Sequence, residues 1–143
     1  MTKLLITGGA GFIGSNFVHY TVHHKPEYEI TVVDKMTYAA NPHNLDGVRE
    51  QITFVQGDIC DAELMDRLIA ETDIVVHFAA ESHNDNSLRD PKPFLDTNVY
   101  GTYTILQAVR NHNKRLHHIS TDEVFGDLAL DNPNRFTEET PYN

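Results

Sequence analysis

Three glycines spaced three residues apart, directly behind a short apolar run, constrain this chain more than any other feature of its sequence. The pattern predicts a strand from Lys3 to Thr7 and a helix from Phe12 to His24. Gly8 permits a tight turn, Gly11 lets a pyrophosphate approach the backbone, and Gly14 allows helix and strand to pack closely. Because the first amides of such a helix bind phosphate, we expect a dinucleotide at this turn.

An acidic residue at the expected interval supports a dinucleotide site. A β-branched run predicts a second strand from Glu29 to Val33, and this strand stops at Asp34. Asp34 lies twenty residues after Gly14, the interval expected for a carboxylate that binds an adenosine ribose. A like charge at about 4 Å costs about 4 kcal/mol at an effective dielectric near 20, which disfavours a 2′-phosphate. The sequence therefore favours NAD over NADP, although the positive charge of Lys35 weakens this preference. The alternative interpretation of Asp34 is a solvated aspartate in a loop.

Further apolar runs complete an alternation of strands and helices, separated by a polar, turn-rich segment at 36–48. The other strands are expected at Ile52–Gln56, Asp73–Ala80 and Leu116–Ser120. The other helices are expected at Asp61–Glu71 and Asp90–Asn111, each capped by its first aspartate. This alternation predicts an α/β fold with a doubly wound parallel sheet, Rossmann-like. From Phe125 onward the composition is that of a loop, so we expect residues 1–143 to be one NAD-binding domain, incomplete at the C-terminus and without a substrate domain.

Apolar residues recur at helical spacing on one face of each predicted helix. They are Ile13, Phe17 and Tyr20 in the first helix, Leu64, Leu68 and Ile69 in the second, and Leu95, Val99, Thr102, Leu106 and Val109 in the third.

Composition excludes several classes of function. The formal charge is −10, from 21 acidic and 11 basic residues, which argues against a nucleic-acid or anionic-membrane surface. No apolar run approaches the roughly 18 residues of a membrane span, and the N-terminus does not resemble a signal peptide. Cys60, the only cysteine, excludes an intrachain disulfide. It predicts a reducing cytoplasm and a structural rather than a nucleophilic role.

The nine histidines do not predict a metal site. His19 and His23 are one helical turn apart on a face that we expect to be solvated, with no third ligand evident nearby. His117 and His118 are expected to point to opposite faces of a strand. We therefore expect no bound metal.

Several motifs together resemble the extended short-chain dehydrogenase/reductase family. They are Gly8–Gly14 with Asp34, Gly57-Asp58-Ile59, Ala79–His83, Thr97–Thr102 and His118–Asp127. Within the family, Thr121-Asp122-Glu123 is similar to the run found in nucleotide-sugar 4,6-dehydratases. The family commonly has an apolar residue where this chain has Asn84, which leaves the packing of that loop open.

The resemblance implies a set of residues that contact the cofactor. They are Gly8, Gly11, Phe12, Ile13, Gly14, Asp34, Lys35, Thr37, Asp58, Ile59, Phe78, Ala79, Ala80, Ser82 and Thr97. Ser82 and Thr121 are implied to contact the substrate.

The resemblance also implies a reaction on a nucleotide-activated hexose. The C4 hydroxyl is oxidised with hydride passing to NAD, the C5 proton is removed as the C6 hydroxyl leaves, and the hydride returns to C6. Such a reaction needs one carboxylate as a base and one carboxyl group as an acid. The resemblance assigns Glu123 as the base, Asp122 as the acid and Thr121 as a hydrogen-bond partner of the C4 oxygen.

The Tyr-x-x-x-Lys pair that performs the oxidation in the family does not occur in these 143 residues. We therefore expect no measurable turnover from this piece alone. Intact relatives are usually homodimers through helices flanking the sheet, for which Asp90–Asn111 is a candidate. A sugar-nucleotide epimerase, or a dehydratase for another nucleotide sugar, is the nearest alternative; an epimerase has no need for the adjacent Asp122 and Glu123. A non-catalytic NAD-binding module is an alternative of a different class.

Overall fold

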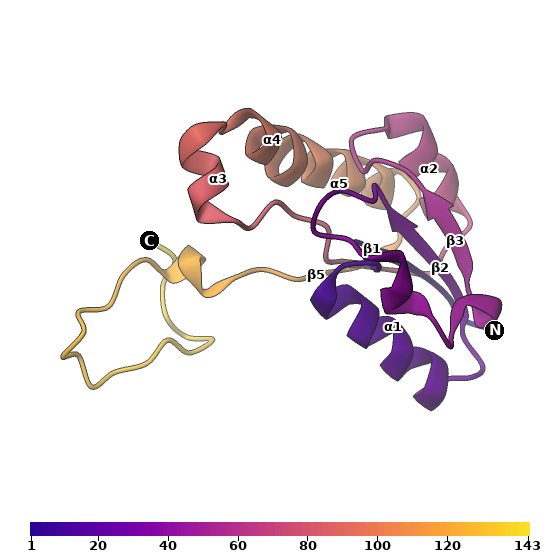
Figure 1. The fold of residues 1–143 in the computed structure, drawn as a ribbon, viewed down its shortest axis with the longest axis horizontal. Helices are drawn as coiled ribbons and strands as arrows, with labels where there is room; N and C mark the ends of the chain where they lie inside the picture. The colour runs from indigo at the N-terminus through magenta and orange to yellow at the C-terminus, as the bar shows by residue number, and fades with distance from the viewer.

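The strands of the computed structural model, which describes residues 1–143, form one parallel sheet in the order β3-β2-β1-β4-β5 (Figure 1). Their bounds are β1 (Lys3–Thr7), β2 (Glu29–Asp34), β3 (Thr53–Gln56), β4 (Ile74–His77) and β5 (Arg115–His118). All four pairings are parallel. The order reverses between β1 and β4, which confirms the predicted doubly wound fold and places the ligand crevice at their carboxyl ends.

Helices cover both faces of this sheet. The α-helices are α1 (Phe12–His24), α2 (Ala62–Ala70), α3 (Asn84–Arg89), α4 (Lys92–Phe94) and α5 (Thr102–Asn111). A π-helical segment, η3 (Leu95–Gly101), joins α4 to α5, and short 3-10 turns form η1 (Pro42–Leu45), η2 (Arg49–Gln51) and η4 (Asp122–Phe125). Figure 1 shows α1 on one side of the sheet and α2 and α5 on the other.

Two apolar cores lie on the two faces, because successive strand residues point in opposite directions. Leu4 and Ile6 of β1 pack in the core beneath α1, together with Val18 and Val22 of that helix. Leu5 packs in the second core, whose other members include residues of α2 and α5. The polar segment at 36–48 also contributes to the fold, because its Leu45 and Val48 are buried in the first core.

The apolar repeat predicted for α1 does not mark its buried face. Ile13 is 66% and Tyr20 58% exposed, and only Phe17 of that set is partly buried. The helix instead packs through small and β-branched side chains, chiefly Val18, Thr21 and Val22. In α2 the predicted apolar face is the buried face: Ile69 is fully buried, and Leu64 and Leu68 pack at the edge of the second core.

The predicted long helix is interrupted, and only part of its apolar repeat packs inward: Val109 contacts the second core, and Thr102 Oγ1 lies 3.2 Å from His77 Nε2. Asp90 accepts a hydrogen bond from the Lys92 backbone N–H at 3.3 Å, as expected of a cap, but the α-helical pattern passes through the π-helical η3 before α5. The residues of η3 and α5 that are buried are Gly101, Thr104, Ile105 and Ala108. Leu95, Val99 and Leu106 are exposed, so they form an outer apolar stripe.

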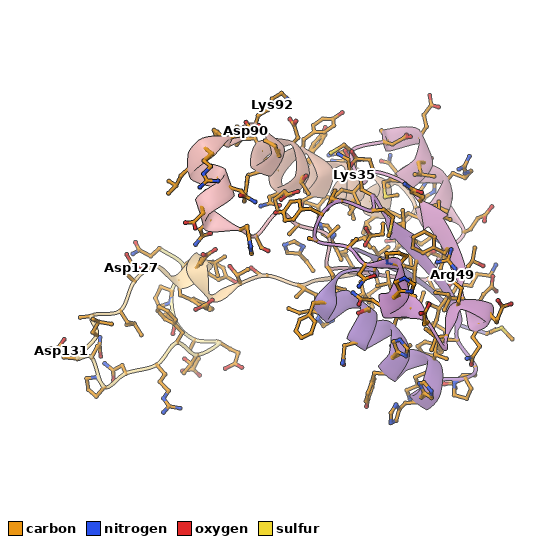
Figure 2. The ribbon with its side chains drawn as sticks, viewed as in Figure 1. Lys35, Arg49, Asp90, Lys92, Asp127 and Asp131 are labelled. Carbon is orange, nitrogen blue, oxygen red and sulfur yellow. The ribbon has the colours of Figure 1, made fainter.

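The residues after η4 contain no regular secondary structure, as predicted from their composition. They form a long loop that closes on η4, where the Asn143 N–H donates to the Val124 carbonyl at 3.1 Å, and Asp127 and Asp131 on this loop lie away from the rest of the molecule (Figure 2). An aromatic cluster closes the loop, with the Phe125 ring 5.3 Å from Phe136 and 5.7 Å from Tyr142. None of the helices has the length and apolar character that crossing a bilayer requires.

Candidate cofactor and active site

The glycine turn joins β1 to α1 at the crevice edge of the sheet. Gly8 has a φ of +69°, and a Cβ on it would lie 2.6 Å from the backbone nitrogen of Ala79. A Cβ on Gly14 would collide with the carbonyl of Gly8. Gly11 has only an ordinary contact of 3.4 Å, to the Gly8 oxygen. The first and third glycines are therefore required by packing, whereas the second is free to leave room for a ligand.

The start of α1 is open to an anion. Gly11 occupies the cap position without a side-chain hydrogen bond, and the first turn contains no acidic residue. Phe12 is 89% exposed, and Ile13 is exposed beside it. The positive end of the helix dipole is thus uncompensated by the protein, which suits a phosphate group.

Asp34 ends β2 and is buried beside the turn. Its Oδ2 accepts a hydrogen bond from the Ala10 N–H at 2.9 Å, and its Oδ1 accepts one from the Met36 N–H at 2.8 Å. These two bonds fix the carboxylate at the carboxyl end of β2. Each oxygen keeps acceptor capacity for a further donor such as a ribose hydroxyl.

Lys35 and Asp58 form an ion pair between the loops after β2 and β3, with Nζ and Oδ2 2.7 Å apart. Asp58 Oδ1 also accepts a hydrogen bond from the Cys60 N–H at 2.9 Å. Burial alone would raise the pKa of Asp58, but the hydrogen bonds from Lys35 and Cys60 outweigh it and hold the pKa below its usual value. The hydrogen bond to Asp58 raises the pKa of Lys35. Lys35 is therefore directed toward Asp58 from its place on the loop after β2 (Figure 2).

Cys60 has the structural role that the sequence predicts. Its Sγ donates a hydrogen bond to the Asp96 carbonyl at 3.1 Å. Burial, and secondarily the neighbouring Asp58, raises the pKa of the Cys60 thiol to about 11, so the thiol stays protonated at neutral pH. A protonated thiol is a poor nucleophile.

The loop after β4 carries Phe78, Ala79, Ala80 and Ser82, but not all of these side chains are available to a ligand. The Phe78 ring packs 5.3 Å from Phe17 in the first core, and Ile59 of the loop after β3 is buried in the second core. The side chain of Ile59 is therefore buried, whereas that of Phe78 is only partly buried. Ala80 and Ser82 are exposed.

A buried polar chain supports this loop from below. The Ala79 N–H donates to Thr7 Oγ1 at 3.3 Å, and Thr7 Oγ1 lies 2.7 Å from His77 Nδ1. His77 Nε2 lies 3.2 Å from Thr102 Oγ1 on α5. Burial, with a smaller contribution from His118, lowers the pKa of His77 to about 4. The neutral imidazole thus joins the ends of β1 and β4 to α5.

Thr97 lies half-buried on η3, and its neighbour Asn98 binds the loop after β4 directly. Asn98 Oδ1 accepts from the Glu81 N–H at 2.8 Å, and Asn98 Nδ2 donates to the Glu81 carbonyl at 2.8 Å. Thr37 lies on the loop after β2, where it lines a cavity together with Tyr38 and Glu81.

Thr121, Asp122 and Glu123 lie on the segment that leaves the carboxyl end of β5, and all three are exposed (Figure 1). Glu123 Oε1 accepts a hydrogen bond from Asn84 Nδ2 at 3.4 Å, and Glu123 Oε2 accepts one from the Thr121 hydroxyl at 3.5 Å. Asn84, which departs from the family pattern, is therefore turned toward the predicted base. Asp122 is the first residue of η4, and its side chain makes no hydrogen bond within the protein.

The histidines do not gather into a ligand set. His19 is half-buried rather than solvated as predicted, because its Nε2 lies 2.9 Å from the Asn44 carbonyl and its ring stacks on His23. His118 packs 5.1 Å from His77, while His117 is exposed. No group of three His, Cys, Asp or Glu side chains is arranged to hold a metal ion.

Sequence reasoning missed Tyr38, His77 and Asn98 as residues that shape this edge. Tyr38 stands out only as an aromatic residue in a polar loop, and His77 only as a polar residue at the end of an apolar strand. The resemblance included Asn98 within a motif but gave it no role. Its hydrogen bonds to Glu81 depend on a contact between distant segments that no local pattern reveals.

The sequence profile of the GDP-mannose 4,6 dehydratase family matches residues 5–143. The chain belongs to this family. Among curated members of similar sequence, the dTDP-glucose 4,6-dehydratase of Mycobacterium tuberculosis is 63% identical over 141 residues, covering 99% of this chain and 43% of the relative. The chain thus spans less than half the length of the relatives it matches.

Solved structures of dehydratases and epimerases share the fold. DesIV, a dTDP-glucose 4,6-dehydratase from Streptomyces venezuelae with NAD bound, superposes with a TM-score of 0.91 at 43% identity, covering 99% of this chain and 45% of DesIV. The UDP-glucose 4-epimerase of Thermus thermophilus, in complex with NAD, superposes with a TM-score of 0.85 at 28% identity, covering 99% of this chain and 44% of the epimerase. Identity is therefore higher to the dehydratase, while the fold is common to both activities.

Proposed function

We propose that residues 1–143 bind NAD and supply the elimination pair of a dTDP-glucose 4,6-dehydratase. The adjacent Asp122 and Glu123 carry this proposal, because they follow the carboxyl end of β5 in the same parallel sheet whose β1 and β2 end at the glycine turn and at Asp34. The 63% identity to a dTDP-glucose 4,6-dehydratase supports the choice of substrate.

The residues present fit a dinucleotide. The uncapped start of α1 suits the pyrophosphate, and the space beside Gly11 admits it. Asp34 is fixed by two backbone amides, and its carboxylate is able to accept hydrogen bonds from the hydroxyls of the adenosine ribose. Its charge disfavours the 2′-phosphate of NADP. The exposed Ala80 and Ser82 border the other side of the switch point.

NAD, held by the start of α1 and by Asp34, would supply the hydride acceptor for C4 of the hexose and the hydride donor for C6. Glu123 removes the proton from C5, which the C4 ketone has made acidic, and returns it to C5 when C6 takes up the hydride. Asp122 donates a proton to the departing C6 hydroxyl, so that the C5–H and C6–O bonds break and one water leaves. In the structure Asn84 and Thr121 both donate hydrogen bonds to the carboxylate of Glu123. When the substrate binds, the single hydroxyl hydrogen of Thr121 turns from Glu123 to the C4 oxygen, and Asn84 remains the partner of Glu123. Proton transfer by two such groups requires that one begin charged and the other neutral.

A chimera tests this proposal. Residues 1–143 replace the matching part of the Mycobacterium tuberculosis relative, and the chimera is supplied with dTDP-glucose. We expect a product lighter by one water in the mass spectrum. Glu123→Gln should abolish the product while NAD binding is kept. A C4 epimer of unchanged mass would instead identify an epimerase, and NAD binding without any product would favour the non-catalytic module.

We also propose a homodimer in the reducing cytoplasm, built through the exposed stripe of Leu95, Val99 and Leu106. Two such stripes packed together would bury apolar surface that one chain leaves in water. Sedimentation of the chimera should give a dimer, and Val99→Lys should shift it to a monomer. A dimer that survives this substitution would exclude the stripe as its interface.

A further inference from the structure

Tyr38 and Glu81 connect two loops that are distant in sequence. The Tyr38 hydroxyl donates a hydrogen bond to Glu81 Oε2 at 2.9 Å. The same hydroxyl accepts one from Asn86 Nδ2 on α3 at 3.3 Å. We call this contact the Tyr38–Glu81 bridge. A hydroxyl that donates to a carboxylate forms a stronger bond than one between neutral groups.

The glutamate end of the bridge is fixed, whereas the tyrosine end is not. Asn98 holds the backbone of Glu81 through two hydrogen bonds of 2.8 Å, so this residue is attached to η3. The Tyr38 side chain is 64% exposed, and a cavity of about 360 Å³ lies beside it, lined by residues that include Asn86 and Phe94. Tyr38 belongs to neither apolar core, and its ring has an aromatic contact with His83, with ring centroids 6.2 Å apart, so the bridge is able to open without disturbing either core.

The position of the bridge follows from the strand order. Tyr38 follows β2 and Glu81 follows β4, and these two strands flank β1 in the sheet. The bridge therefore spans from one side of the glycine turn to the other, across the switch point where the dinucleotide is proposed to lie. Asp34 and Thr37 precede it on the same loop, at the ribose end of that site.

We propose that the Tyr38–Glu81 bridge closes across the bound dinucleotide and slows its release. This role rests on the proposed function, in which the cofactor ends each turnover in the state in which it began and need not leave. A residue that holds the loops together after binding acts mainly on the dissociation rate. Tyr38 and Glu81 are then positioning residues that retain the cofactor without reacting.

The test measures dissociation of NADH from the chain by stopped-flow fluorescence, with excess NAD as the competitor. We expect Tyr38→Phe to raise the dissociation rate by roughly five- to tenfold, as loss of one charge-assisted hydrogen bond predicts. The association rate and the midpoint of thermal unfolding should stay unchanged, because the ring remains and the hydroxyl is not buried. Tyr20→Phe is the matched control, since Tyr20 is similarly exposed but lies on the outer face of α1.

A double-mutant cycle sharpens the test. Glu81→Gln should also raise the dissociation rate, and the double variant should release NADH no faster than Tyr38→Phe alone, because both changes break the same bond. If the two substitutions raise the dissociation rate independently and additively, the proposed role of the bridge is wrong. An unchanged rate in Tyr38→Phe would overturn it while leaving the proposed cofactor intact, whereas failure of the unsubstituted chain to bind NADH would overturn both.

Discussion

His77 Nδ1 lies 2.7 Å from Thr7 Oγ1, beneath the carboxyl edge of the sheet. Because the Ala79 N–H already donates to Thr7 Oγ1, the Thr7 hydroxyl hydrogen is free to donate to the imidazole. His77 then carries its own proton on Nε2 and donates it to Thr102. The imidazole must remain neutral to accept from Thr7, which agrees with its pKa of about 4.

This arrangement predicts a loss of stability in mild acid. The folded pKa of about 4 lies below the ordinary histidine pKa of 6.5, so the unfolded chain takes up a proton first as the pH falls. Between these two values the free energy of unfolding should fall by up to about 3 kcal/mol through this group. Urea unfolding at pH 7 and at pH 4 measures it. In His77→Gln the pH-dependence should be smaller by that amount, whereas His117→Gln, at an exposed position, should behave like the unsubstituted chain; an equal dependence in His77→Gln would contradict the prediction.

The glycines of the turn should separate folding from binding. Gly8→Ala introduces a Cβ 2.6 Å from the Ala79 nitrogen at a φ of +69°, so we expect a loss of about 2–4 kcal/mol in the free energy of unfolding. Gly11→Ala meets only an ordinary contact and should leave stability within about 1 kcal/mol. It should nevertheless weaken NAD binding by at least about tenfold, because the Cβ enters the space proposed for the pyrophosphate. Urea unfolding and calorimetric titration measure the two effects; normal NAD affinity in Gly11→Ala would place the pyrophosphate elsewhere.

Asp34→Asn should change both stability and cofactor preference. A carboxamide has one acceptor oxygen, so either the Ala10 or the Met36 N–H loses its partner, at a cost of about 1–3 kcal/mol. Loss of the charge should raise the affinity for NADP relative to NAD by about tenfold or more. Titration with both cofactors measures the ratio. Asp127→Asn, on the loop that projects from the molecule, is the control and should leave the ratio unchanged (Figure 2).

The ion pair of Lys35 with Asp58 should restrict the lysine. In Asp58→Asn the ammonium group is released, and we expect a several-fold gain in NADP affinity with a stability change below about 1 kcal/mol, as for other exposed pairs. Adding Lys35→Met should cancel the gain. Asp96→Asn breaks the comparable pair with Lys92 and should not affect NADP binding. A gain that persists without Lys35 would show that Asp58 itself repels the phosphate.

The strands and the glycine turn could be predicted from sequence because local signals determine them. An apolar run places β1, and a β-branched run places β2, within one residue of the observed bounds, and Asp61 caps α2 through the Leu64 N–H as expected. The strand predicted at Asp73–Ala80 is shorter in the structure, where β4 ends at His77. Such features depend on neighbours a few residues away. The position of Asp122 and Glu123 shortly after the last strand also follows from the sequence.

Other features depend on tertiary contacts and could not be predicted in this way. Much of the apolar repeat in α1 and in the η3–α5 segment points outward, because other residues of these helices, such as Val18 and Ile105, pack against the sheet. The short α3 carries no local signal, and its Asn84 and Asn86 reach segments 39 and 48 residues away in the chain. Their roles appear only when the fold brings these segments together.

The π-helical segment η3 has a consequence for recombining such proteins. In an α-helix each residue advances the chain by about 100°, so one residue more or fewer in this segment would rotate α4 by that angle relative to α5. Asn98 would then leave Glu81, although the aligned sequences would differ by a single gap. Crossover points for chimeras between relatives should therefore keep Leu95–Gly101 from one parent, whatever the overall identity.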